Sequence, residues 1–196
     1  MTTLILVRHG ETDWNRDGRW QGQADAPLNE RGREQARALA DELMGEPVDA
    51  VYASDLSRAR ETAEIIAARL GREPVEVDTR LREVHVGGWS GLTMAEIEDR
   101  FPAEFELWRS GDPAHDFAGG ETYAAMGERV VEALEEIASR HPDSNVLVVL
   151  HGGSIRGAMA HAAGITYTEQ SRRRAHVGNC GLVRLAVRDG AFAGID

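Results

Sequence analysis

A cation and an imidazole directly follow a short apolar run near the start of this chain. Residues 4–7 read Leu-Ile-Leu-Val without a polar break, and Arg8, His9 and Gly10 come next. Such a run is typical of a strand buried on both faces of a parallel sheet, and ligands bind just beyond the carboxyl ends of such strands. Because glycine lets the backbone turn sharply and approach a ligand closely, the sequence predicts a binding site at Arg8 and His9.

A second apolar run ends in the same way. Residues 146–150 read Val-Leu-Val-Val-Leu and lead into His151, which a pair of glycines follows. Arg58 follows a further predicted strand at residues 48–53 and lies in the first turn of a predicted helix. Arginine bonds phosphate oxygens in pairs through its planar fork. Two arginines and two histidines at one sheet edge therefore predict a pocket for a dianion, with phosphate as the obvious one.

These residue types also suggest how a bound phosphate group could react. A histidine can serve as a covalent nucleophile, and phosphoryl transfer needs positioning and stabilisation of the spread negative charge. The leaving group of an ester needs a proton as its bond breaks, and Glu83 is the best-placed carboxylic acid for that task. The structural alternatives are a helix-cap or surface role for Glu83 and surface ion pairs for Arg8 and Arg58.

Strands and helices that must position these residues alternate along the chain. Strands are predicted at residues 3–7, 48–53, 75–77, 146–150, 182–187 and 192–195. Helices are predicted at residues 33–44, 55–70, 122–140 and 154–163, with short ones from 93 and around 105–108. This alternation indicates βαβ units. We therefore predict an α/β fold, a three-layer α/β/α sandwich around a mostly parallel sheet, in one domain over residues 1–196 with a cap-like insertion at about 81–120.

Composition excludes several other classes of protein. The 196 residues carry a formal net charge of −11, which argues against nucleic acid as a partner because such binding depends on neutralising phosphates. The chain contains no lysine, so a Walker-type phosphate loop and Schiff-base chemistry are excluded. No apolar run approaches about 18 residues and no signal peptide is apparent, so no membrane association is expected. The single cysteine, Cys180, indicates a structural thiol and a cytoplasmic location.

Five segments together resemble the signature of a known family. They are Arg8-His9-Gly10-Glu11-Thr12 with Trp14-Asn15, Leu28-Asn29-Glu30-Arg31-Gly32 with Gln35-Ala36, Ser54-Asp55-Leu56-Ser57-Arg58-Ala59 with Glu61-Thr62-Ala63, Leu81-Arg82-Glu83 with Gly87-Gly88-Trp89-Ser90-Gly91, and Val149-Leu150-His151-Gly152-Gly153. Each is weak alone, but together they span most of the chain. They resemble the histidine phosphatase superfamily, which has the phosphoglycerate-mutase-like fold, and in particular its broad-specificity phosphatases.

The resemblance implies a role for each matching position. His9 would be the nucleophile that becomes phosphorylated, and Glu83 would donate a proton to the leaving group and then act as base for the attacking water. The phosphoryl group would be held by Arg8, Arg58, a charged His151, Asn15 and the backbone N–H of Gly152. Thr12, Gln21 and Gly22 are expected to border the substrate pocket. No metal and no organic cofactor is implied, and the substrate would be a small phosphorylated metabolite.

Two other functions stay open on the sequence. The cofactor-dependent phosphoglycerate mutases of this family carry an arginine directly after the acid, a nearby lysine and an insert with paired arginines. This chain has Val84 after Glu83 and no lysine, so hydrolysis is favoured over mutase transfer. The second alternative is a phosphate-recognising regulatory module, which the retained catalytic residues disfavour. The resemblance also suggests a homodimer. The run Arg172-Arg173-Arg174 predicts a solvated surface, with contact to an anionic substrate tail as the alternative.

Overall fold

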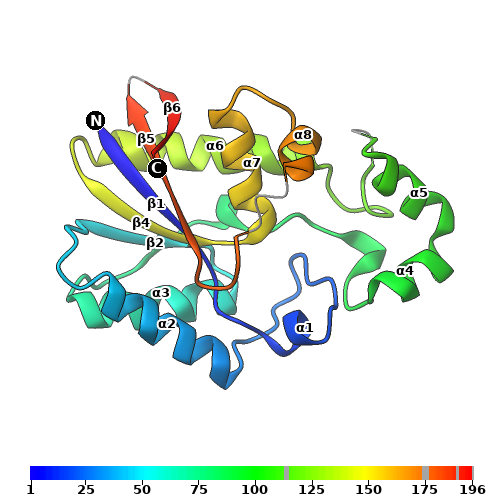
Figure 1. Cartoon of the computed structure of the whole chain (residues 1–196), viewed down its shortest axis with the longest axis horizontal. Helices are drawn as coiled ribbons and strands as arrows, with labels where there is room; N and C mark the ends of the chain where they lie inside the picture. The colour runs from blue at the N-terminus through cyan, green and yellow to red at the C-terminus, as the bar shows by residue number, and fades with distance from the viewer. Residues whose placement is uncertain (113–114, 174–176, 189, 196) are drawn as a thin grey trace.

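Six strands form one mixed sheet in the computed structural model, which describes residues 1–112, 115–173, 177–188 and 190–195 (Figure 1). The strands are β1 (Thr2–Arg8), β2 (Ala50–Ala53), β3 (Glu76–Val77), β4 (Asn145–Leu150), β5 (Leu182–Arg188) and β6 (Ala191–Ile195). Their order across the sheet is β3-β2-β4-β1-β5-β6. The first four strands in that order run parallel to one another. β5 pairs antiparallel with β1, and β6 pairs antiparallel with β5. The prediction of a mostly parallel sheet is therefore confirmed.

Helices cover both faces of this sheet. The α-helices are α1 (Asp13–Arg16), α2 (Glu30–Glu42), α3 (Ser57–Leu70), α4 (Met94–Arg100), α5 (Pro102–Ser110), α6 (Tyr123–Arg140), α7 (Gly152–Ala162) and α8 (Tyr167–Arg172). Two 3-10 turns are η1 (Thr79–Leu81) and η2 (Gly87–Trp89). Figure 1 shows α2 and α3 below the sheet and α6 and α7 above it. This arrangement is the three-layer sandwich that the sequence predicts. Across the described ranges, no helix combines the length and the apolar character needed to cross a membrane.

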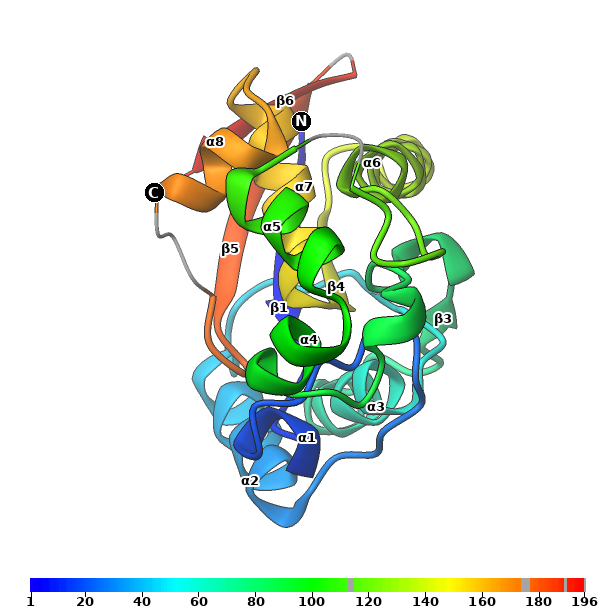
Figure 2. The ribbon, with the colours of Figure 1, turned by 90° about the vertical axis from the view of Figure 1, so that its right-hand side faces the viewer.

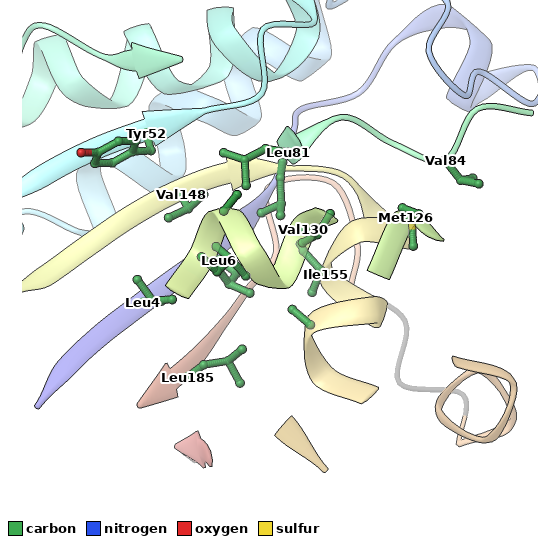
Figure 3. Packing of buried hydrophobic residues seen from close by; sticks show 14 of the residues in the cluster. Leu4, Leu6, Tyr52, Leu81, Val84, Met126, Val130, Val148, Ile155 and Leu185 are labelled. Atoms are coloured by element: carbon green, nitrogen blue, oxygen red, sulfur yellow. The ribbon is translucent and has the colours of Figure 1, made fainter. Parts of the chain in front are cut away.

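The alternation of side chains along β1 explains why both faces must be covered. Leu4 and Leu6 point to one face and pack in a core that includes Val130 of α6 and Ile155 of α7 (Figure 3). The intervening residues of the strand, Ile5 and Val7, pack in a separate core with α2 and α3. Successive strand residues point to opposite faces, so an unbroken apolar strand is stable only when both faces are buried.

Two short helices escaped prediction because each is defined by its cap and not by an apolar stripe. Thr12 caps α1, and Thr166 caps α8, each with the reciprocal hydrogen bonds of a capping box. Capping also explains why α2 begins at Glu30, three residues before the predicted start, since the Asn29 side chain accepts a 2.9 Å hydrogen bond from Gly32 N. A side-chain oxygen at this position satisfies backbone N–H groups that have no partner within the helix.

The segment from residue 81 to residue 120 connects the 3-10 turn η1 to α6 and contains no strand of the sheet. It contains α4 and α5, which lie beyond the end of the sheet at which β1 and β4 finish (Figures 1 and 2). Its buried residues Trp89, Ile97 and Phe117 belong to the same core as Leu6 of β1. The segment is thus packed on the sandwich through a shared core.

Candidate active site

Strand register brings both predicted histidines to one edge of the sheet. Arg8, the last residue of β1, pairs with Leu150, the last residue of β4, and a histidine directly follows each strand. The backbone N–H of His9 donates to the carbonyl of Leu150 at 3.0 Å. His9 and His151 are both buried, and their ring centroids lie 5.2 Å apart in an edge-on arrangement. The two imidazoles therefore contact each other just beyond the strand ends, where His9 lines a pocket and His151 lies behind His9, outside the pocket lining.

One hydrogen bond fixes the chemical form of the His9 ring. Nδ1 of His9 lies 2.7 Å from the carbonyl oxygen of Gly10. A carbonyl oxygen only accepts hydrogen bonds, so Nδ1 must carry the proton. The other ring nitrogen, Nε2, then keeps its lone pair, and His9 borders the pocket at this edge. This is the form of histidine that can attack phosphorus.

Glycine is required at position 10 because two loops meet there. A Cβ on Gly10 would lie 2.5 Å from the carbonyl oxygen of Gly32, a distance that no side chain can occupy. The backbone N–H of Gly10 also donates to the hydroxyl of Thr62 in α3 at 3.0 Å, and that hydroxyl donates to the carbonyl of Arg58 at 2.7 Å. Thr62 thereby couples the loop after β1 to the helix that carries Arg58, a role that its sequence position did not reveal.

Buried hydrogen-bonding groups without a protein partner surround the two histidines. Arg58 uses its terminal nitrogens to hold the carbonyls of Gly22 and Ala24, each at 2.7 Å. Its Nε and both ring nitrogens of His151 are buried and have no hydrogen-bond partner within the described ranges. Leaving such groups unpaired costs free energy, so an anion that accepts their hydrogen bonds would stabilise this part of the site. Arg8, which donates to the carbonyl of Val177 at 2.9 Å, borders the same pocket.

The protonation state of His151 differs between the free pocket and the form implied by the resemblance. Burial lowers the pKa of His9 and of His151 well below the ordinary value of about 6.5, and the positive charge of Arg58 lowers it further. In the free pocket both imidazoles are therefore neutral. A bound dianion reverses this balance, because its negative charge favours the imidazolium. A charged His151 thus belongs to the complex with an anion.

Anion binding should take up protons as a result. Sulfate stays a dianion across the range from pH 5 to pH 7, so any pH dependence of its binding comes from the protein. The complex has the higher histidine pKa and holds more protons than the free protein, so affinity should rise as pH falls, by at most about tenfold per pH unit for each proton. Calorimetric titrations in buffers of different ionisation enthalpy measure this uptake. His151→Gln should reduce it, His161→Gln on the exposed part of α7 should not, and sulfate binding without proton uptake would contradict the prediction.

The carboxyl group of Glu83 is held by two backbone N–H groups. Oε1 accepts from Val84 N at 2.9 Å, and Oε2 accepts from Gly153 N at 2.8 Å. A Cβ on Gly153 would lie only 2.2 Å from Oε1, so the second glycine after His151 is what lets the carboxylate approach the start of α7. Glu83 borders the same pocket as His9, as a proton donor to a leaving group would have to.

Arg129 of α6 fixes the loop that carries Glu83, and sequence reasoning missed it. Its NH1 donates to the carbonyls of Arg80 and Arg82, both at 2.7 Å, and its NH2 donates to the carbonyl of Glu83 at 2.9 Å. The guanidinium also forms a two-bonded ion pair with Glu121, each bond 2.7 Å long. Nothing in the spacing of Arg129 within a helix marks it as different from an exposed helical arginine.

The remaining predicted residues divide between the pocket wall and its support. Asn15, Gln21, Gly22 and Gly152 line the pocket. Thr12 lies behind it, fully buried, with its hydroxyl within hydrogen-bond distance of the side chains of Asn15 and Gln21. Thr12 is therefore placed to orient two pocket residues without reaching the pocket itself.

Two hollows lie side by side at this end of the molecule. The pocket with His9 has a volume of about 430 Å³. A larger groove of about 930 Å³ runs between α5, α6, α7 and α8, and Tyr123, Arg156 and Tyr167 border both. The described residues include no cluster of three or more His, Cys, Asp or Glu side chains that could hold a metal ion.

Two further predictions concern residues away from the histidines. Arg172 and Arg173 are exposed, as expected for a solvated surface, and Arg172 borders the larger groove. Arg174 lies outside the described residues. Burial raises the pKa of the Cys180 thiol to about 12, so the thiol stays protonated and fits a structural role. Cys180 N donates to the carbonyl of Arg8 at 2.9 Å, which ties this turn to the end of β1.

Comparison with known proteins agrees with this geometry. The sequence model of the histidine phosphatase superfamily (branch 1) matches residues 4–194. The chain is 39% identical over 165 residues to phosphoserine phosphatase 1 of Hydrogenobacter thermophilus, covering 84% of this chain and 78% of that protein. It is 36% identical over 190 residues to a probable phosphoglycerate mutase GpmB of Serratia proteamaculans, covering 94% of this chain and 85% of that protein. The solved structure of Bacillus stearothermophilus YhfR is similar with a TM-score of 0.89 at 35% identity, covering 99% of this chain and 95% of that one.

Proposed function

This chain belongs to the histidine phosphatase superfamily, and from that premise we propose that it is a metal-independent phosphatase that hydrolyses small phosphomonoesters through a phosphohistidine on His9. One observation carries the proposal. The hydrogen bond from Nδ1 of His9 to the Gly10 carbonyl leaves Nε2 as a nucleophile, and His9 lies beside His151 and Arg58, whose buried ring nitrogens and Nε have no hydrogen-bond partner in the described part of the chain. A nucleophile next to an anion pocket is what phosphoryl transfer requires.

The reaction proceeds in two steps. In the first, Nε2 of His9 attacks phosphorus, the ester P–O bond breaks, and Glu83 gives its proton to the departing oxygen. In the second, water attacks the phosphohistidine, Glu83 takes the water proton, and the N–P bond breaks to release inorganic phosphate. Arg8, Arg58 and charged His151 offset the negative charge that spreads over the phosphoryl oxygens in both steps.

Hydrolysis that survives metal removal is the first test. We expect the purified protein to release p-nitrophenol from p-nitrophenyl phosphate at mildly acidic to neutral pH, at the same rate with and without EDTA. The reason is that Arg8, Arg58 and His151 supply the positive charge that a metal ion would otherwise provide. Loss of activity in EDTA, restored by adding a divalent cation, would overturn metal independence. No activity under either condition would overturn the proposal.

A mutase activity is the second candidate, because the chain is similar to the probable phosphoglycerate mutase of Serratia proteamaculans. A mutase would pass the phosphoryl group from His9 to a second hydroxyl, and would need to exclude water from the phosphohistidine. Conversion of 3-phosphoglycerate into 2-phosphoglycerate in the presence of 2,3-bisphosphoglycerate, without net phosphate release, would favour this candidate over the phosphatase.

The proposal includes three further assignments. Residues 81–120 serve as a cap, because Glu83 near the start of this segment borders the pocket and its Trp89 and Phe117 pack against Trp20, which lines the pocket. The phosphatase acts in the cytoplasm, a location that cell fractionation would test. It forms a homodimer, which sedimentation would test.

A further inference from the structure

Arg156 is a cation that lines the pocket and has no role in the two reaction steps described above. It lies on α7, four residues after Gly152 and three after Gly153, so it follows the start of the helix by one turn, roughly 5 Å. It lines the pocket together with His9 and Glu83 and also borders the larger groove. Arg156 therefore lies where the pocket meets the larger groove, and the part of a substrate beyond its phosphate extends past this point.

An aromatic wall holds the Arg156 side chain in place. Its NH1 donates to the hydroxyl of Tyr167 at 3.0 Å, and its guanidinium carbon lies 5.5 Å from the centre of that ring. Tyr167 stacks on Tyr123 with ring centroids 3.8 Å apart and planes inclined by 13°. Trp108 of α5 donates to the Tyr123 hydroxyl at 3.3 Å. The wall separates the pocket from the groove and leaves the guanidinium little freedom to move.

Arg156 keeps its charge in this environment, because burial lowers its pKa but Tyr167, Tyr123 and Glu83 outweigh burial and raise the pKa above the ordinary value. In the described part of the chain no carboxylate lies within ion-pair distance of it. It is half-buried, and its positive charge acts on Arg8, where it adds to the effect of burial in lowering the pKa of that guanidinium. Half-buried cations that repel one another are stabilised by a bound anion. Arg8 and Arg58 carry two positive charges that match a phosphate dianion, so Arg156, which Glu83 attracts without forming an ion pair, is left to pair with a further negative group of the substrate.

We propose that Arg156 binds a carboxylate of the substrate, and hence that the phosphatase acts on phosphate monoesters of small hydroxy acids, including amino acids with a side-chain hydroxyl. The inference rests on the proposed function of the same pocket. A guanidinium pairs with a carboxylate through two parallel hydrogen bonds. In a three-carbon acid phosphorylated at its last carbon, the carboxylate carbon is four bonds from phosphorus, which is roughly 5 Å in an extended chain and comparable to one turn of α7.

Pairs of esters that differ only in the carboxylate test this assignment. The first pair is 3-phosphoglycerate and glycerol 3-phosphate, and the second is phosphoserine and phosphoethanolamine. We expect kcat/KM of the wild type to favour the carboxylate in each pair, and Arg156→Gln to reduce this preference by about 10- to 100-fold. Arg156→Lys should keep part of the preference because it keeps the charge but loses the planar fork. Arg37→Gln, on the exposed side of α2, should leave the preference unchanged.

The ratio of kcat/KM between the two esters of a pair distinguishes a carboxylate-binding role of Arg156 from a structural role. An equal loss on both members of a pair would mean that Arg156 acts on the phosphoryl group or on the fold, and would overturn the assignment. An unchanged preference in Arg156→Gln would overturn it as well. If the wild type hydrolyses p-nitrophenyl phosphate but shows no carboxylate preference, the assignment fails while the proposed function stands.

A binding measurement keeps the assignment testable without turnover. If the wild type hydrolyses no ester, the proposed function fails, and the affinities of 3-phosphoglycerate and glycerol 3-phosphate are then compared by calorimetry. The background is His9→Ala, with and without Arg156→Gln. Tighter binding of 3-phosphoglycerate that disappears with Arg156→Gln supports the carboxylate site. Equal affinities for the two esters overturn it.

Discussion

His9→Ala should lose p-nitrophenyl phosphate hydrolysis by about 10⁴-fold or more, while the protein stays folded. Without the nucleophile the phosphohistidine cannot form, so the whole covalent route is lost and not only one interaction that stabilises its transition state. The fold should survive, because His9 follows the end of β1 and the two cores on either side of the sheet do not include it. Initial rates of phosphate release, together with thermal unfolding of the same preparation, measure both parts of the prediction.

Two other variants sharpen the test of His9. His9→Asn can keep a side-chain hydrogen bond to the Gly10 carbonyl but has no nucleophilic nitrogen, so it should be as inactive as alanine. His161→Ala removes an exposed histidine of α7 and should retain activity. Substantial turnover by either His9 variant would remove His9 as nucleophile. A phosphate label that is stable to base and labile to acid in the wild type, and missing in both variants, would identify phosphohistidine directly.

Glu83→Gln should slow esters with poor leaving groups far more than p-nitrophenyl phosphate. A glutamine cannot donate the proton that an alkoxide leaving group requires, whereas p-nitrophenolate leaves without one. We expect a loss of about 10²- to 10⁴-fold in kcat for an alkyl phosphate, and about tenfold or less for p-nitrophenyl phosphate. Equal losses on both substrates would mean that Glu83 positions the site but does not act as an acid.

A substitution at Gly153, which lies against the Glu83 carboxylate, tests the same role in a second way. In Gly153→Ala the new Cβ would lie 2.2 Å from Oε1 of Glu83, so the carboxylate must move and the same selective loss on alkyl phosphates should appear. Gly127→Ala is the matched control on α6, where an added Cβ meets no atom within 4 Å. That control should keep its activity and gain about 0.5–1 kcal/mol of stability, because alanine is the better helix former.

Local sequence was sufficient to locate the two histidines. The apolar runs before His9 and His151 predicted buried parallel strands, and parallel strands end at one sheet edge, so the two residues had to lie near each other. The same reasoning placed Arg58 at this edge from the first turn of a helix. The expectation that Thr12 borders the pocket came from its place in the motif after His9, and the structure instead shows Thr12 as the N-terminal cap of α1. In the structure the Thr12 side chain faces its own helix start and Gln21.

Contacts between distant segments were beyond the reach of the sequence. Arg129 holds the loop with Glu83 from a helix some forty-six residues further along, and Arg156 is held by Tyr167, which follows it by eleven residues in a different helix. The sequence predicted a solvated surface for the run at Arg172 and gave no sign of Arg156, whose spacing resembles that of any helical arginine.

The sequence by itself indicated the fold class, because periodicity and strand ends are local properties, and the resemblance of five segments taken together indicated the family and its phosphoryl chemistry. Tertiary structure decided the rest. It fixed the tautomer of His9 through the Gly10 carbonyl, buried His151 so that its pKa falls well below the ordinary value, and held Arg156 at the pocket through a hydrogen bond to Tyr167. Burial, pKa and charge balance depend on which distant groups surround a side chain, and only the folded chain brings those groups together.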